Sequence, residues 1–520
     1  MDTNIAYGLM IATLGVFGYI GYQASNAKEI EADDYLSARG SQDWLRIGLS
    51  LFASGMGIWI LFGPSEVGYY GGFWDVVGYA VSSATPFILL AYVGPQIRDR
   101  LPTGVTLADY VRIRLGRPMQ IYVGLISVLY MFTFLFAEFT AIGKATETLS
   151  DAEPLVPMFL VGVVTAAYIT QGGLPASLAT DRIQAWTILF LVIALLLTLF
   201  GGDINGLISD AKAYNPEDSW SIGSMSYMDS FKSGLALVVA ITAAEMFSQG
   251  NWQRAWASES DKALTKGAWL AAGLVLPLVF VMGVLGTVVA GQGAVDDPSS
   301  AFFYLIDDAG VLFVAAFIVL AIALACSSVD TLQNAVVASI SRDLSDSKMD
   351  IQNARYLTVA MIPVAIYLAT GPKLPFTIPL IGISALDAGG VFQIFLFADL
   401  LAAATVMPVL LTLWNRISSQ GALLGAVCGL LSVVAYGAVT GDLRDGIEYI
   451  FSPTNEFGLA NLEVFLSAVI GSTIVTIVGS LFLLSTYTSN SWNNFRNDNR
   501  PRRGLRPENH SGAGCLRTLD

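Results

Sequence analysis

Long apolar stretches recur along almost the entire chain, and they limit its fold more than any other feature. Each is roughly 20 residues long, the length that an α-helix needs to cross about 30 Å of hydrocarbon. Lipid offers no partners for backbone polar groups, so an isolated span of this kind must be helical. About thirteen windows have this character, at residues 4–23, 45–70, 72–96, 118–147, 154–171, 180–201, 229–250, 264–291, 310–342, 354–371, 385–414, 418–440 and 460–484. The sequence therefore predicts an all-α polytopic membrane protein with about 13 transmembrane helices.

The composition agrees with this fold class and narrows the range of functions. Of the 520 residues, 54% are hydrophobic and 13% are charged, which is too apolar for a series of soluble domains. The one histidine, His510, lies in a polar C-terminal stretch, and the three cysteines (Cys326, Cys428 and Cys515) lack the spacing of metal ligands. We expect no enzyme, no zinc site and no nucleic-acid partner.

The basic residues indicate which side of the membrane each loop faces, because cytoplasmic loops are enriched in Lys and Arg. With the N-terminus outside, the inner loops carry Lys28, Arg39, Arg98, Arg100, Arg112, Arg114, Arg117, Arg182, Arg254, Lys262, Lys266, Arg342, Lys348, Arg355, Arg416 and the tail arginines. The outer loops then carry only Lys144, Lys212, Lys232, Lys373 and Arg444. This asymmetry predicts a multi-pass protein of the cell membrane, surrounded by lipid, with its N-terminus outside and its C-terminus in the cytoplasm.

A polar cluster interrupts one of the longest apolar windows. In the stretch LACSSVDTLQN, the residues Ser327, Asp330, Thr331 and Asn334 follow i, i+3, i+4, i+7 spacing and share one face of a helix. A carboxylate near the bilayer centre costs at least about 2.5–3.5 kcal/mol and usually marks an ion or substrate path. We interpret the cluster as a cation site. In the alternative interpretation, the hydroxyls bond to their own helix and Asp330 only joins neighbouring helices.

The second apolar window contains residues that break a helix. Gly55, Gly57, Gly63 and Pro64 all lie inside it, and a proline both removes a helical hydrogen bond and clashes with the preceding turn. Irregular backbone at membrane depth is tolerated where it is buried in protein or lines a cavity, and secondary transporters use such breaks to bind ions. A simple kink is the alternative.

Seven motifs, in order along residues 30–440, resemble the sodium:solute symporter family, which includes sodium-coupled proline and sugar transporters. They are ADDYLSARG (32–40), ASGMGIWILFGP (53–64), GPQIRDRLPTGVTLADYVRIRLG (94–116), GGLPASLATDRIQAW (172–186), QGNWQR (249–254), SSVDTLQNAVVASISRDL (327–344) and NRISSQGALLGAVCGL (415–430). The resemblance implies two inverted five-helix repeats, a broken first core helix and transport by alternating access.

On this basis we divide the chain into four regions. Residues 1–44 form an extra N-terminal helix with a cytoplasmic loop, and residues 45–414 form the inverted-repeat core. Residues 415–486 supply additional transmembrane helices. Residues 487–520 form a polar cytoplasmic tail, whose composition is typical of disorder.

The resemblance also implies sodium as the coupling ion. The family's main site corresponds here to the backbone carbonyls of Ala53, Met56 and Leu324 and the hydroxyls of Ser327 and Ser328. Oxygen ligands of this kind suit a hard cation. A second sodium, found in some members, corresponds to Asp181, Ser327, Asp330 and Thr331. Asp181 has an alternative role as a helix cap, and Gly55 departs from the family, which has an acidic or amide residue at that position.

The other polar residues inside the windows are candidates for binding the transported solute. We predict this role for Trp59, Glu66, Glu138, Glu245, Gln249 and Gln393, and Asp399 is a further acidic residue of this group. No basic residue is expected near mid-span to pair with these acids, which disfavours an anionic substrate. We expect a small neutral or amine-bearing solute, such as an amino acid like proline, urea or a polyamine. Glu66 has an alternative role in the first turn of a helix, and Glu138 and Asp399 in hydrogen bonds between helices.

The predicted function is therefore sodium-coupled symport by a secondary active transporter. Proton coupling on the same fold, with Asp330 or Glu245 titrating, is the first alternative. A transporter-like membrane sensor that acts with a separate partner is the second.

Overall fold

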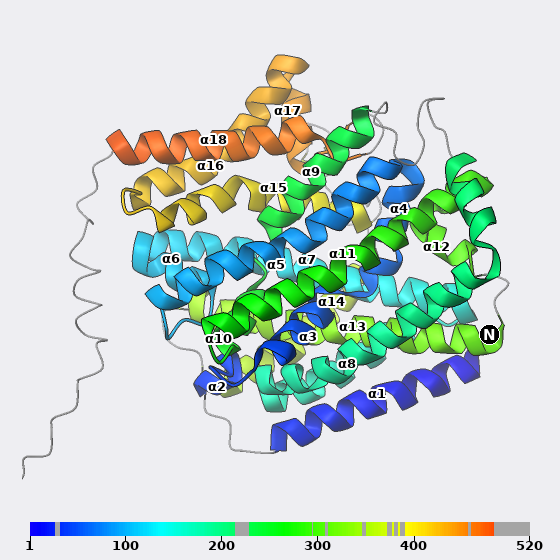
Figure 1. The fold of residues 1–520 in the computed structure, drawn as a ribbon. Coiled ribbons are helices and arrows are strands. Elements are labelled where there is room, and N and C mark those ends of the chain that lie inside the picture. The colour runs from blue at the N-terminus through cyan, green and yellow to red at the C-terminus, as the bar shows by residue number, and fades with distance from the viewer. Residues whose placement is uncertain are drawn as a thin grey trace, which may run out of the picture.

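The computed structural model is a bundle of helices that run side by side, and it describes residues 1–26, 32–213, 228–293, 295–306, 310–345, 350–371, 377–378, 383–384, 391–455 and 459–482 (Figure 1). The predicted tail at 487–520 lies outside the described residues. The long helices are α1 (Thr3–Asn26), α3 (Trp44–Gly55), α5 (Phe73–Arg100), α7 (Arg117–Ser150), α8 (Leu155–Ala213), α9 (Met228–Glu245), α11 (Asp261–Gln292), α13 (Val311–Ser339), α14 (Ile351–Ala369), α15 (Val391–Leu410), α16 (Ser419–Thr440) and α18 (Leu462–Phe482). The shorter elements are α2 (Ala32–Ser37), η1 (Ile58–Leu61), α4 (Gly63–Tyr70), α6 (Leu107–Leu115), α10 (Gln249–Ala257), η2 (Pro298–Ser300), α12 (Ala301–Tyr304), η3 (Ile340–Leu344), η4 (Leu411–Leu413), α17 (Leu443–Phe451) and a hairpin of β1 (Thr377–Ile378) and β2 (Ile383–Ser384).

The described residues do not confirm the number of spans that the sequence predicts. Nine of the described helices are long and apolar enough to cross a membrane, and the number rises to 11 when each of two bent helix pairs counts as one span. The all-α polytopic fold is confirmed, whereas the count of about 13 is not. Two predicted windows, 154–171 and 180–201, fall within the single element α8, and the window at 354–371 corresponds to α14, which is not among the nine.

Element α8 nevertheless contains two halves that meet at Gly173, where the backbone has a positive φ of 55°. A side chain at this position would place its Cβ 2.3 Å from the carbonyl oxygen of Tyr35, so glycine is required there. The first half follows α1, since Val164 lies against Gly18 and Tyr168 against Gly21. A second irregular residue, Asp203 (φ −146°, ψ 78°), separates the second half from the last residues of α8. These last residues pack on the end of α11, where Gly291 lies against Asp210.

The first core helix is broken as predicted. Asp43 caps α3 by accepting hydrogen bonds from two backbone N–H groups, and the helix ends at Gly55. Met56 then leaves the helical region (φ −99°, ψ 79°), and η1 and α4 continue at an angle of 58°. Pro64 stands in the first turn of α4, where its missing N–H costs little, so the proline begins the second half of the span.

A second break, which the sequence analysis does not predict, lies at the corresponding place in the second repeat. Helices α9 and α10 also meet at 58°, with Met246, Phe247 and Ser248 between them. No proline marks this break. Instead, the N–H groups of Phe247 and Ser248 bond three residues back, to Ala244 and Glu245, which tightens and ends α9. Both repeats therefore begin with an interrupted helix, as expected for an inverted-repeat transporter.

The two ends of the bundle can be told apart by the groups that lie there. At one end, here called the N-terminal face, the amino group of Met1 donates to Leu149 O (3.1 Å), and α4, α12 and the end of α11 lie nearby (Figure 1). At the opposite end, here called the basic face, α2, α6 and α10 gather (Figure 1). Arg39 there donates to Pro102 O, and Arg114 donates to Thr412 O.

Candidate cation site and solute pocket

The break in α3 and the polar cluster of α13 meet in the middle of the bundle. Ser327 Oγ lies 2.9 Å from the carbonyl oxygens of both Ala53 and Leu324, and Ser328 Oγ lies 3.4 Å from Ser54 O. These residues are buried or nearly so. The last carbonyls of a helix have no partner within it and carry partial negative charge, so the end of α3 and the serine hydroxyls together offer oxygens suited to a cation.

The structure therefore brings together Ala53, Leu324, Ser327 and Ser328, four of the five residues predicted for the main sodium site. The fifth, Met56, is buried at the break itself. Its N–H donates to Phe52 O, and no described hydrogen bond joins its carbonyl to α13. Chelation by Met56 O therefore stays a prediction.

Asp181 lies in a buried cluster with an arginine. Its Oδ2 is 2.6 Å from Nη2 of Arg254, and the hydroxyl of Ser50 donates to the same oxygen. Arg254 also donates to Ser50 Oγ (2.7 Å), to Thr331 Oγ1 (2.7 Å) and to Gly250 O (3.0 Å). The Asp181 and Arg254 side chains are both 0% exposed. The guanidinium thus joins α10 to α3, α8 and α13 and balances the charge of Asp181.

Asp330 has a different environment, made of hydroxyl groups. It accepts hydrogen bonds from Tyr168 (2.6 Å), Ser177 (2.8 Å) and Thr180 (3.1 Å), all on α8. The residues predicted for a second sodium are consequently near one another but already engaged, since Asp181 and Thr331 contact Arg254 and Asp330 contacts α8. The positive-inside count assigned Arg254 to a cytoplasmic loop. In the structure Arg254 is instead fully buried, and its pairing with Asp181, 73 positions away in the sequence, accounts for this.

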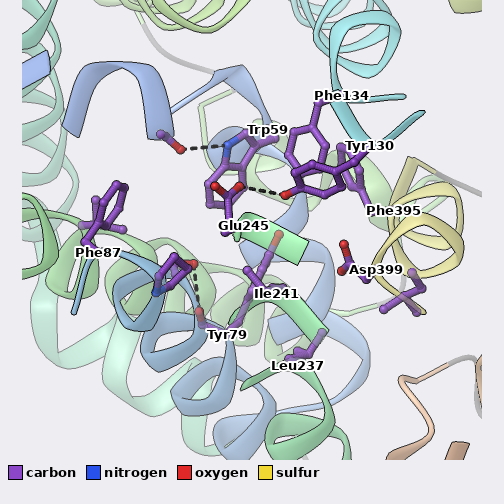
Figure 2. A pocket seen from close by; sticks show the side chains of 15 residues that line it. Trp59, Tyr79, Phe87, Tyr130, Phe134, Leu237, Ile241, Glu245, Phe395 and Asp399 are labelled. Atoms are coloured by element: carbon purple, nitrogen blue, oxygen red, sulfur yellow. Dashed lines mark hydrogen bonds between the residues drawn. The ribbon is translucent and has the colours of Figure 1, made fainter. Parts of the chain in front are cut away.

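A pocket lies beside the break, among α5, α7, α9 and α15. Its volume is about 60 Å³, enough for a few water molecules. Its walls are largely aromatic and are formed by Trp59, Tyr79, Phe87, Tyr130, Phe134 and Phe395. Figure 2 shows Glu245 and Asp399 pointing into it from α9 and α15. Two of the residues predicted to bind the solute, Trp59 and Glu245, therefore meet in this pocket. Most of the aromatic lining was not predicted from the sequence, because aromatic residues are common in any apolar helix.

The two carboxylates of the pocket are held differently. Glu245 accepts hydrogen bonds from Tyr130 Oη (2.8 Å) and from Asn251 Nδ2 (2.8 Å). Asp399 is 3% exposed, and no described hydrogen bond reaches it. Among the described residues, no ion pair includes either acid, and none of the residues that line the pocket is basic. The pocket is a buried acidic site without a cation supplied by the described part of the chain.

The pocket continues toward the cation site. A smaller cavity shares Gly55, Trp59 and Glu245 with it and reaches Ser328 and Thr331. Gly55 stands where the family has an acidic or amide residue, and a side chain there would place its Cβ 2.7 Å from the ring of Phe87. The glycine therefore allows the ring of Phe87 to pack closely against the end of α3, where both cavities have a wall.

Glu138 supports the broken helix. Its Oε2 accepts a hydrogen bond from the N–H of Ile58 (2.9 Å), one of the donors that the break leaves without a helical partner. A Cβ at Gly57 would lie 2.0 Å from Glu138 Oε1, which explains the glycine. Glu138 also lines the smaller cavity, so both of its predicted roles remain.

Two further residues predicted to bind the solute, Gln249 and Glu66, are not among those that line the pocket. Gln249 is wholly buried, accepts from the N–H of Leu107 (2.8 Å) and donates to Ser127 Oγ (2.9 Å), which fits a structural role. Glu66 stands in the first turn of α4, toward the N-terminal face. The side chain of Gln393 lies outside the described residues.

A comparison with protein families decides the identity of the fold. The model of the sodium:solute symporter family matches residues 35–429, most of the chain. The chain belongs to the sodium:solute symporter family. As a member of this family it is a membrane transporter and not an enzyme, and its fold and resemblance were predicted correctly.

The relatives differ in how much of the chain they cover. A spermidine transporter of Candida albicans is 29% identical over 447 residues, which are 84% of this chain and 79% of the relative. The sodium/glucose cotransporter 1 of Ovis aries is 30% identical over 168 residues, which are 32% of this chain and 24% of that protein. The match to the sugar transporter thus spans only about a quarter of its length.

Solved structures share the fold. A sodium-coupled sialic acid symporter in a substrate-bound, outward-open state has a TM-score of 0.69 at 15% identity, covering 92% of this chain and 98% of the other. A nucleobase-cation-symport-1 family transporter has a TM-score of 0.53 at 14% identity, covering 91% and 98%. At these identities the likeness concerns the arrangement of helices alone.

Proposed function

We propose that this symporter couples the entry of Na⁺ to the uptake of a cationic amine, with a polyamine as the favoured cargo. The observation that carries the proposal is the aromatic pocket with two buried carboxylates, Glu245 and Asp399, and no basic residue among those that line it. A buried charge is costly unless it is paired. An ammonium group of the cargo would pair with these acids.

The walls of the pocket favour the same class of ligand. Cations bind to the faces of Trp, Tyr and Phe rings, and hydrogen bonds between ionised groups are stronger than neutral ones. Trp59 and Tyr79 lie 5.8 Å apart between ring centroids and form one wall with Phe87. A solute with its own carboxylate, such as proline, would meet two acids without a balancing cation. Similarity to a spermidine transporter supports the amine.

Sodium would act through the end of α3. An ion held by the carbonyls of Ala53 and Leu324 and by the hydroxyls of Ser327 and Ser328 would join the broken helix to α13. Because the smaller cavity connects Ser328 to Glu245, this joint would also fix one wall of the pocket. We propose one coupling ion per cycle, since Arg254 already balances Asp181 and binds Thr331.

One sodium ion is sufficient to drive such a cargo. A tenfold gradient supplies about 1.4 kcal/mol, and a potential of 100 mV adds about 2.3 kcal/mol per charge. With a divalent amine, three charges cross together, and the total reaches about 8 kcal/mol. The charge of the cargo itself therefore contributes most of the driving force.

The same proposal includes the orientation of the protein. The basic face carries Arg39, Arg98, Arg114 and Arg117, together with Lys262, as a cytoplasmic face should. The N-terminal face would be external, and the cell membrane is the expected location.

Uptake into proteoliposomes tests the function. Labelled spermidine, putrescine, proline and urea are offered with an inward Na⁺ gradient or an equal K⁺ gradient, to the wild type and to Glu245→Gln and Ser328→Ala. We expect Na⁺-dependent uptake of the two amines, reduced at least tenfold in both variants. Glu448→Gln, at an exposed site on α17, and Ser432→Ala, whose hydroxyl bonds within α16, serve as matched controls.

Each failure has a separate meaning. Amine uptake that runs equally well in K⁺ would overturn the sodium coupling, and a pH gradient would be tested next. Uptake of proline or urea in preference to both amines would overturn the assignment of the cargo. Retention of amine uptake in Glu245→Gln would show that the pocket is not the binding site.

A further inference from the structure

A second set of groups that suits an ammonium ion lies near the N-terminal face, and a lysine of the chain occupies it. The ammonium of Lys144 on α7 is 2.6 Å from Asp297 Oδ2 and donates to Ser299 Oγ at 2.5 Å. It also lies 5.9 Å from the ring centroid of Phe62, over its face. A carboxylate, a hydroxyl and an aromatic face are the partners that a primary ammonium group prefers.

The carboxylate of this set is held by its own loop. Asp297 accepts hydrogen bonds from the N–H of Ser299 (3.1 Å), from Ser299 Oγ (2.7 Å) and from Ser300 Oγ (3.0 Å). Partial burial raises the pKa of Asp297. The hydrogen bonds from Lys144, Ser299 and Ser300 have the larger combined effect, and they bring the pKa below its ordinary value. Asp297 is therefore negatively charged at neutral pH. Its three hydrogen bonds from Ser299 and Ser300 do not depend on the lysine.

Exposure makes the lysine replaceable. The side chains of Lys144 and Asp297 are 34% and 46% exposed, in contrast with the wholly buried pair of Arg254 and Asp181. Exposed ion pairs contribute only about 0–1 kcal/mol. A small amine in solution can therefore compete with the lysine for the carboxylate.

The position of the set relates it to the pocket. Phe62 follows η1, the segment that also carries Trp59 of the pocket wall, and Glu66 comes one turn later in α4. The charges of Lys144 and Asp297 both act on Glu66. The segment from η1 to α4 therefore leads from the pocket toward the N-terminal face, and it carries Trp59, Phe62 and Glu66 in that order.

We propose that Asp297, Ser299 and the face of Phe62 form an outer binding site for the primary ammonium groups of the cargo, which Lys144 occupies until an amine displaces it. This inference rests on the proposed function for the identity of the cargo and for the external position of this face. The site would collect amines at the entrance, before they reach Glu245 and Asp399.

Two substitutions should change the concentration of putrescine for half-maximal uptake in opposite directions, and this tests the site. Lys144→Met removes the competing ammonium and keeps the aliphatic stem, so the concentration of putrescine that gives half-maximal uptake should fall about two- to fivefold. Asp297→Asn removes the carboxylate, so the same concentration should rise by a similar factor. Lys232→Met and Glu463→Gln are matched controls, because these two residues form a comparable exposed pair at 2.8 Å, with 43% and 40% exposure. Neither control should change it.

A purely structural pair predicts something else. If Lys144 and Asp297 only fasten α7 to the loop after α11, both substitutions will change uptake in the same direction, and the proposal is wrong. If the wild type takes up no amine, the proposed function fails instead. The outer site is then tested by equilibrium dialysis of labelled putrescine, which should bind Lys144→Met protein more tightly than wild type or Asp297→Asn, and equal binding would overturn it.

Discussion

Two buried acidic sites, one at Asp181 and the other at Glu245 and Asp399, differ in whether the chain supplies the balancing charge. Asp181 is paired with Arg254, and Ser50 and Thr331 complete the hydrogen bonds of the guanidinium. Glu245 and Asp399 have hydroxyl, amide and aromatic neighbours, but no described basic residue joins them. In the first cluster the protein itself supplies the opposite charge, and Asp181 Oδ1 accepts no described hydrogen bond. The second lacks a positive charge, and a cargo that supplies one would complete it.

The difference separates a structural acid from a binding acid. All three carboxylates are buried, and each would be strongly unfavourable if left ionised and alone. Burial alone therefore does not distinguish the two roles. What distinguishes Asp181 from Glu245 and Asp399 is that the described part of the chain provides its opposite charge, and this can be tested at either site by removing or adding a cation.

The largest effect is expected at the structural cluster. Arg254→Met leaves Asp181 buried without its partner, which should lower the free energy of unfolding by about 3–5 kcal/mol. The measurement is the thermal unfolding of the purified protein in detergent. Glu245→Gln should leave this stability unchanged or raise it slightly, because it removes a charge that has no partner.

Two further observations sharpen this test. The double variant Arg254→Met/Asp181→Asn should recover most of the lost stability, because the stranded charge is gone. NaCl should stabilise Arg254→Met more than choline chloride does, since Na⁺ can then enter the place predicted for a second ion. A variant as stable as the wild type would contradict the role assigned to Arg254.

The next effect concerns the pocket, which is tested by adding a cationic ligand and not by removing a basic side chain. A cargo at about 100 times its dissociation constant should stabilise the wild type by about 2.7 kcal/mol. Spermidine should therefore raise the unfolding temperature of the wild type, and proline or urea at equal ionic strength should not. Glu245→Gln should lose the response. Stabilisation of Glu245→Gln by spermidine to the same extent would place the amine elsewhere.

The general fold was predictable because its signals are local. Span length, the glycines and Pro64 around the break in α3, and the polar face of α13 each follow from a short stretch of sequence. Their meeting at Ser327 and Ala53 depended on the family resemblance, since these residues are 274 positions apart. The pattern of apolar residues alone does not contain this pairing.

The missed features depend on three-dimensional packing. Arg254 resembles any basic residue at the end of a span, and only the neighbouring Asp181, 73 positions away, shows that it is buried. The second break, at Met246–Ser248, has no proline to announce it. The aromatic walls of the pocket, such as Tyr79 and Phe395, look like ordinary apolar residues until α5, α7, α9 and α15 are arranged around one cavity.

The smallest effect separates orientation of the binding acid from its charge. Tyr130→Phe keeps the aromatic face but removes the hydroxyl that donates to Glu245 (2.8 Å), leaving Asn251 as its donor. One such hydrogen bond is worth about 1 kcal/mol, so half-maximal amine uptake should need about a fivefold higher concentration. Tyr122→Phe is the matched control, because this tyrosine of the same helix contacts Thr405. Equal effects of the two substitutions would mean that Tyr130 contributes its ring and not its hydroxyl, and that the position of Glu245 is set by the break between α9 and α10.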